Sequence, residues 1–137
     1  MTLALEDRLA VMELLALHGH LVDDGALDRL AEVFTADVEY DLTDFGRGTL
    51  TGVAALRDAA LALGAANPVA HHVTDIVLEP LDEGRVRARS KGLGVTTDGT
   101  CGSVTYEDTV VRVGVAWRVA RRKVIARRTP LGGAGRS

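Results

Sequence analysis

The second half of the sequence contains four long runs rich in β-branched residues, and these runs require a fold with a large sheet. They cover residues 69–81, 85–97, 102–115 and 117–129. Short segments with turn-forming residues, such as Asp82-Glu83-Gly84 and Asp98-Gly99, separate them. Turns of this length join neighbouring antiparallel strands. The sequence therefore predicts an antiparallel meander of four strands from Val69 to Thr129.

The first half of the sequence shows helical spacing instead. Apolar residues recur every three or four positions from Leu5 to Val22, and again in a shorter stretch from Ala26 to Thr35. A third, alanine-rich helix is expected from Val53 to Leu63, ended by Gly64. Residues 38–42 are a plausible strand, and residues 44–52 a turn with a second short strand.

Helices followed by a meander are typical of an α+β fold. We expect three N-terminal helices packed on a strongly curved, mainly antiparallel sheet, which forms a cone with a central pocket for a small ligand. A chain of 137 residues is long enough for one domain with a real core. We assign that domain to residues 1–130, and we expect the Gly-rich tail 131–137 to be disordered.

Charge and composition argue against several partners. The net charge is -3, which favours neither nucleic acid nor an anionic membrane. Residues 118–128 are rich in arginine, but Val119, Val124 and Ile125 interrupt them, so we interpret them as a strand with a charged outer face. The single Cys101, the absence of a long apolar run and the acidic N-terminus predict a cytoplasmic protein.

Asp23 is the first candidate site residue. It lies with Asp24 in the last turn of the first predicted helix, just before Gly25. Helix C-termini are electronegative and disfavour carboxylates. A local misfit of this kind often marks function. The alternative is that Asp23 is a solvated turn acid or the N-cap of the next helix.

Two adjacent histidines, His71 and His72, open the first long strand. Neighbouring strand residues point to opposite faces, so only one of them can enter a pocket. The apolar positions Val73, Ile76 and Leu78 do not fix which one, because both faces of the strand could be partly buried. Histidine suits proton transfer, since its ordinary pKa is near neutrality.

Three more polar residues are candidates for substrate binding. Tyr40 and Tyr106 are able to donate a hydrogen bond to a substrate oxygen, although each could equally pack its ring in the core. His18 is five residues before Asp23, about 140° away around an ideal helix. A zinc site formed by His18, His72 and Asp23 is chemically feasible, but the usual close pairs of ligands are missing, so we expect no metal.

Four segments together resemble the SnoaL-like branch of the nuclear transport factor 2-like superfamily. They are the helical opening, LVDDGALDRLAEVFTADVEY, AHHVTDIVLE and YEDTVVRVGVAWRVARR, and the similarity covers about residues 5–128. That branch includes scytalone dehydratase, bile acid 7α-dehydratase and polyketide cyclases. The resemblance implies an α+β cone, a homodimer through the sheet and a pocket without a cofactor.

The resemblance also implies roles for particular residues. In the dehydratases, an aspartate that ends the first helix and a histidine of the later strand carry out acid/base catalysis, and these positions match Asp23 and His72. His18 matches a tyrosine of the bile acid enzyme. Two features depart from scytalone dehydratase: Val22 replaces a tyrosine, and no histidine lies between Ser103 and Val111.

The resulting functional prediction is a cofactor-independent lyase, isomerase or cyclase for a hydrophobic polyketide-like or steroid-like molecule. His72, held by Asp23, would remove a proton next to a carbonyl, and a tyrosine or His18 would stabilise the oxygen. The alternative is a non-catalytic ligand-binding or dimerisation module with the same fold, because a fold does not determine function.

Overall fold

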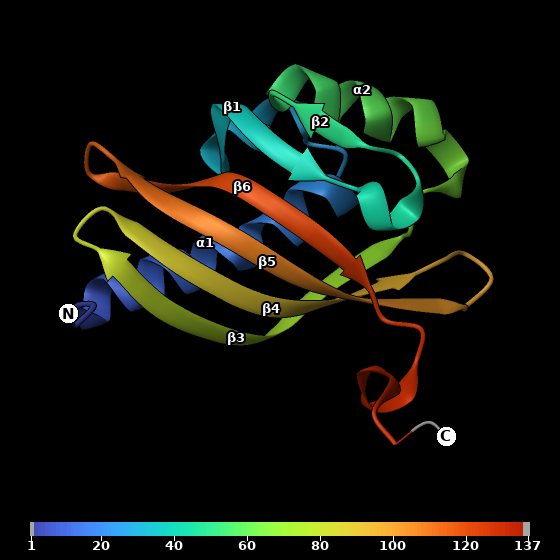
Figure 1. Ribbon diagram of the computed structural model, residues 1–137. Coiled ribbons are helices and arrows are strands. Elements are labelled where there is room, and N and C mark those ends of the chain that lie inside the picture. Colours follow the sequence, from blue (N-terminus) through green and yellow to red (C-terminus); the bar gives the residue numbers. More distant parts are fainter. Residues whose placement is uncertain (1, 136–137) are drawn as a thin grey trace.

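The computed structural model describes residues 2–135, with helices on one face of a single sheet (Figure 1). Helix α1 covers Leu5–Asp23, and α2 covers Val53–Leu63. Short 3₁₀ helices lie in the connections: η1 (Leu27–Glu32), η2 (Thr43–Phe45), η3 (Gly64–Ala66) and η4 (Pro130–Gly133).

The sheet has six strands in the order β2-β1-β6-β5-β4-β3. All neighbours are antiparallel except β1 and β6, which are parallel. The predicted meander is confirmed as the four consecutive strands β3 to β6, and the α+β cone is confirmed as the fold class. The strands are β1 (Phe34–Asp41), β2 (Thr49–Thr51), β3 (Ala70–Asp82), β4 (Arg85–Val95), β5 (Cys101–Val113) and β6 (Ala116–Ala126).

The second predicted helix is shorter than expected and is a 3₁₀ helix. It ends at Glu32, and Phe34 already begins β1. The backbone N–H of Val119 in β6 donates to the carbonyl of Val33 at 2.7 Å, so the sheet captures the chain at this point. Val33 and Phe34 also favour extended backbone. Strand pairing therefore outweighs the helical spacing that continued to Thr35.

Strand β3 changes the face that it presents to the core. His71 and Val73 are partly buried in its first half, whereas Ile76 and Leu78 are partly buried in its second half. The pairing with β4 shifts between Thr74 and Val77, and Asp75, inside this interval, has φ of 56°. The extra residue of such a bulge reverses the phase of the strand. This explains why the apolar positions of the sequence did not share one phase.

Strand β6 contains a second change of phase. Val119 pairs with Val110 and Arg121 with Thr109, which leaves Ala120 as the extra residue. Trp117 and Val119 face the core before it, and Arg122 and Val124 face the core after it. The prediction that the arginine-rich strand carries only an outer charged face is therefore wrong for Arg122, which is fully buried.

The two faces of the sheet differ in character. On β4, Val86, Ala88 and Ser90 are buried while Arg85, Arg87 and Arg89 are exposed, so one face of the strand points to water. Helix α1 lies across the inner face, and Figure 1 shows no helix over the outer face of β3 to β6.

The end of the chain bears on two earlier expectations. Residues 131–133 of the predicted disordered tail lie in η4, and residues 136–137 fall outside the described part of the chain. Within residues 2–135, none of the helices combines the length and the hydropathy needed to cross a membrane.

Candidate functional site

The last turn of α1 places Asp23 against the start of β3, where it binds His71 twice. Oδ1 of Asp23 lies 2.6 Å from Nδ1 of the His71 ring. Oδ2 of Asp23 accepts a hydrogen bond of 2.9 Å from the backbone N–H of the same residue. The two side chains are 22% and 19% exposed, respectively, so they are shielded but reachable. Two bonds fix the carboxylate and the imidazole relative to each other.

The predicted contact of Asp23 with His72 is wrong by one strand position. His72 is exposed and pairs with Leu93, on the face of β3 opposite to His71. The choice of His72 followed the family resemblance. In the structure, His71 has the same phase as Val73, and the extra residue of the bulge at Asp75 lets Ile76 reach the same inner face with the opposite phase. An aspartate and a histidine do meet, as predicted, but the histidine is His71.

The bonds of His71 define its chemistry. A carboxylate only accepts hydrogen bonds, so the Nδ1 atom of His71 carries a proton and donates the hydrogen bond that Asp23 accepts. In the neutral ring, Nε2 then has a free lone pair. This arrangement of a carboxylate that orients an imidazole is the one that general bases use. The geometry therefore allows His71 to accept a proton at Nε2.

A surface cavity of about 520 Å³ opens beside Asp23, between the ends of α1 and α2 and the start of β3. Its walls are mostly apolar, with Val22, Leu27, Leu61 and Val69 among them. Few polar side chains reach it besides that of Asp23: they are Asn67 and Thr97. Asn67 uses its Nδ2 group to bind the carbonyls of Ala60 and Gly64, each at 2.8 Å, which closes the end of α2.

The inner face of the sheet holds a buried ion pair. Nε and Nη2 of Arg122 donate to the two carboxylate oxygens of Asp108 at 2.7 and 2.9 Å. Both side chains are completely buried. Burial works to lower the pKa of Arg122, but the charge and the hydrogen bonds of Asp108 outweigh it and raise the pKa. The pair is fixed in its charged form, and its two charges cancel.

His18 lies against this ion pair and is 7% exposed. Its Nδ1 atom lies 3.1 Å from Nη1 of Arg122. An arginine has only donors, so Nδ1 of His18 accepts and the proton of the neutral ring is on Nε2. Burial lowers the pKa of His18 well below 6.5, and the charges of Arg122 and His71 act in the same direction. His18 is therefore a neutral ring that donates at Nε2.

The two predicted tyrosines lie close to the same arginine. The ring centre of Tyr106 is 4.1 Å from the guanidinium carbon of Arg122, and that of Tyr40 is 6.0 Å from it. Burial raises the pKa of both hydroxyls. Each tyrosine therefore stays protonated at neutral pH and is able to act as a donor.

Gly92 on β4 makes room for Tyr106. A methyl group on Gly92 would lie only 2.4 Å from Cε2 of Tyr106 and 2.8 Å from its hydroxyl oxygen. The ring thus leans across β4 at Gly92, which pairs with Val73 of β3. Val73 is two residues from His71. The ring and the hydroxyl of Tyr106 therefore lie over Gly92 of β4, the strand between β5 and β3.

Side chains on the inner face of β4 become smaller along the strand. The series is Val86, Ala88, Ser90, Gly92 and Gly94. The hydroxyl of Ser90 is buried and has no hydrogen-bond partner in the described part of the chain. The side chains of β4 therefore fill less of the inner face toward the end of the strand next to His71, since Gly94 pairs with His71.

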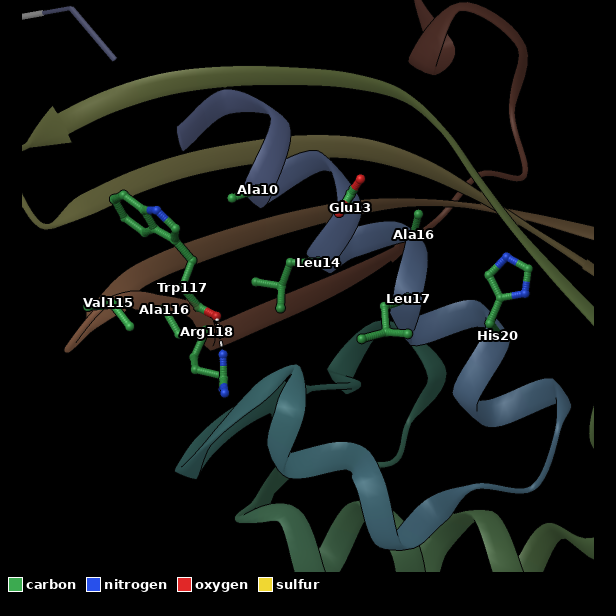
Figure 2. Close-up of a pocket in the computed structure, with 10 residues that line it drawn as sticks. All are labelled: Ala10, Glu13, Leu14, Ala16, Leu17, His20, Val115, Ala116, Trp117 and Arg118. Carbon is green, nitrogen blue, oxygen red and sulfur yellow. Dashed lines mark hydrogen bonds between the residues drawn. The ribbon is translucent and has the colours of Figure 1, made fainter. Parts of the chain in front are cut away.

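A second cavity, of about 500 Å³, lies on another part of the surface (Figure 2). It is formed by α1 residues from Ala10 to His20 and by the start of β6. Trp117 at its wall is 4% exposed, and its indole N–H donates to Asp7 at 3.1 Å. None of the predicted site residues lines this cavity.

Potential metal ligands are dispersed over the structure. Among residues 2–135, no group of three or more His, Cys, Asp or Glu side chains is arranged to hold a metal ion. Of the three residues considered for zinc, His18 contacts Arg122, Asp23 contacts His71, and His72 is exposed.

Sequence reasoning missed Arg122 and Asp108, although one signal was available for the arginine. Val119 and Val124 are five residues apart, so an unbroken strand would place them on opposite faces. If both are core residues, a bulge must lie between them, and one of the charged residues in between is turned inward. No comparable signal marks Asp108, which sits in a regular part of β5.

Comparison with known proteins gives a family and a set of related folds. A family profile described as a SnoaL-like domain matches residues 3–123. No curated protein sequence matches the chain. Among solved structures, an NTF2-like protein with a cystatin-like fold from Novosphingobium aromaticivorans is 30% identical, with a TM-score of 0.73 and coverage of 89% of this chain and 82% of the other.

Two further structures come from the same organism. A candidate aromatic ring hydroxylase is 27% identical, with a TM-score of 0.79, over 93% of this chain and 94% of that protein. A candidate scytalone dehydratase is 22% identical, with a TM-score of 0.74, over 90% of this chain and 86% of that protein. The last similarity is one of fold.

Proposed function

The chain belongs to the SnoaL-like domain family of the nuclear transport factor 2-like superfamily, and from this we propose that it is a cofactor-independent enzyme that transfers protons on small apolar molecules. The observation that carries the proposal is the Asp23–His71 pair, joined at 2.6 Å, in which Asp23 lines an apolar cavity and His71 lies behind it. His71 replaces His72 in the role that the sequence suggested.

In the proposed reaction, Nε2 of His71 removes a proton from a carbon next to a carbonyl, and Asp23 stabilises the imidazolium that forms. The negative charge moves to the carbonyl oxygen. His18 Nε2–H and the Tyr106 hydroxyl are neutral donors on the same inner face, and they are proposed to bind this oxygen. Loss of water, a shift of a double bond and ring closure all begin with this step.

The walls of the cavity indicate the class of substrate. They are aliphatic, and aromatic residues make up only 4% of the chain, so stacking contributes little. The positive charge of Arg122 is neutralised by Asp108, so it does not attract an anionic ligand. We therefore expect a hydrophobic polyketide-like or steroid-like molecule with a carbonyl group and no net charge.

Proton abstraction is tested directly with a bicyclic aliphatic ketone such as 2-decalone in D₂O. The enzyme should exchange the protons next to the carbonyl, which is measured as loss of their NMR signals. We expect Asp23→Asn and His71→Gln to lower the exchange rate by about 10²–10⁴-fold, the usual contribution of a general base. His72→Gln is the matched control, because His72 is exposed on the opposite face.

The same experiment addresses a non-catalytic role. A carrier would bind the ketone without any exchange above that in buffer, and its affinity would survive both substitutions. That result would remove the enzymatic proposal and leave a ligand-binding module with this fold.

We also propose a homodimer formed through the outer face of the sheet. Neighbouring strands present Arg89, Glu107 and Lys123 side by side in register, so opposite charges alternate across this face. Val77, 65% exposed, lies next to Arg89. Light scattering should give twice the chain mass of 14.5 kDa, and Val77→Asp should shift the protein toward the monomer. A monomer at all concentrations would contradict the proposal.

A further inference from the structure

Gly19 lies in α1 at the closest approach of this helix to β3. A methyl group on Gly19 would lie 2.8 Å from the carbonyl oxygen of His71 and 3.6 Å from its Cβ. A carbon atom is almost never found that close to a backbone oxygen, and backbone atoms of a strand have little freedom to move away. Only a glycine fits between the helix and His71.

The reason for glycine at this position is space and not backbone conformation. Gly19 lies inside α1 and is buried. Glycine is the least favourable residue in a helix interior after proline, because it loses the most conformational freedom. The helix is thus weakened at this position in return for a close contact with β3.

Gly19 and Asp23 are four residues apart, which places them on the same side of the helix, one turn from each other. Both meet the same residue of β3. The carbonyl of His71 faces Gly19, and the N–H and the ring of His71 bind Asp23. Because β3 is an edge strand, no further strand within residues 2–135 occupies this side of His71. One turn of α1 therefore takes the place of a neighbouring strand.

From this geometry we propose that Gly19 is a positioning residue that sets the distance between Asp23 and His71. It touches no substrate. The short approach at Gly19 brings the last turn of α1 near enough for the Asp23 carboxylate to span both the backbone N–H and Nδ1 of His71. This inference rests on the proposed function only for its catalytic consequence; the contact itself is independent of any reaction.

The test is Gly19→Ala, studied by NMR in the full chain. In the wild type, the proton between Asp23 and Nδ1 of His71 should give a low-field resonance, and the His71 amide should exchange slowly. In Gly19→Ala, the low-field resonance should disappear, and the His71 amide should exchange about tenfold faster, as expected for the loss of one hydrogen bond. Amides in the centre of β5 should keep their exchange rates.

The matched control is Gly102→Ala. Gly102 is also a glycine of ordinary conformation, but a methyl group there would meet no atom within 4 Å. This variant should leave both signals of His71 unchanged. A second variant, Gly19→Ala/Asp23→Glu, tests the distance itself. The longer side chain of glutamate should again bring a carboxylate to Nδ1 of His71, so the low-field resonance should return.

Three outcomes would overturn the proposal. They are an unchanged low-field resonance in Gly19→Ala, equal effects of Gly19→Ala and Gly102→Ala, and a Gly19→Ala protein that does not fold. The last would show that Gly19 serves the fold as a whole. Because these measurements need no turnover, they stand even if 2-decalone is not processed. If Gly19→Ala also lowers the rate of proton exchange in 2-decalone by about 10²-fold while binding is retained, the contact at Gly19 matters for catalysis as well.

Discussion

Arg122 and Asp108 form a doubly hydrogen-bonded ion pair inside the cone, and neither side chain is exposed to solvent. A buried charge that loses its partner is far more costly than a surface charge that does so, because no water replaces the partner. The pair therefore gives the first prediction.

Asp108→Asn should lower the free energy of unfolding by about 3–5 kcal/mol, because Arg122 remains buried without its counter-charge. Urea denaturation followed by circular dichroism measures the change. Glu32→Gln serves as the control, since it breaks the exposed Arg29–Glu32 pair, which solvent screens, and should change the free energy of unfolding little. Similar losses in the two variants would contradict the assignment of a buried pair.

His18 should make the protein less stable as the pH falls below 6.5, the ordinary pKa of histidine. The unfolded chain then gains a proton at His18, whereas the folded chain does not, because burial holds the pKa of His18 well below that value. The free energy of unfolding should thus fall by up to about 1.4 kcal/mol per pH unit from this group.

The measurement for His18 is a series of denaturation curves between pH 7 and pH 5. In His18→Gln this part of the pH dependence should be absent, while Gln still offers Arg122 an oxygen acceptor. Parallel pH profiles of the wild type and the variant would contradict this prediction, because they would mean that His18 takes up its proton at the same pH in the folded and the unfolded chain.

Ser90→Ala should leave the stability unchanged or raise it by about 1 kcal/mol. The hydroxyl of Ser90 is buried and has no partner in the described structure, so its removal saves a desolvation cost without breaking a bond. Thermal unfolding measures the effect. Thr109→Ala, on the neighbouring β5, is a control for general loss of β propensity. A clear loss of stability in Ser90→Ala alone would reveal a hydrogen bond to the hydroxyl.

Gly92→Ala should destabilise the protein by about 1–3 kcal/mol, because the new methyl group meets the ring of Tyr106. The expected signature is a coupling with Tyr106. In the Tyr106→Leu background the ring is absent, so Gly92→Ala should cost clearly less there. Additive effects of the two substitutions in urea denaturation would argue against the close contact.

The fold was predictable because it depends on patterns that repeat along many residues. The meander from β3 to β6, helix α1 and helix α2 each follow from spacing of apolar residues over ten or more positions. The second helix was predicted with the wrong type and end. Its last predicted residues, Phe34 and Thr35, instead belong to β1, which pairs with β6, a strand that is distant in sequence.

The site was predictable in kind but not in register. A carboxylate at the end of α1 and a histidine at the start of β3 do meet, but a bulge decides which histidine it is. The bulge depends on a single residue, Asp75, with an unusual backbone conformation. Periodicity alone gives no position for such an extra residue, and the incompatible phases of Val73 and Ile76 were its only trace.

The extra residue in β6 has a consequence for insertions and deletions. Ala120 stands outside the ladder between Val119 and Arg121, so deleting it would leave a continuous ladder in which Val119 and Arg122 still point inward. Deleting any neighbour beyond it, such as Lys123, would instead invert every following side chain and turn Val124 toward water. Position 120 is therefore the place in this strand where the deletion of one residue should be tolerated best.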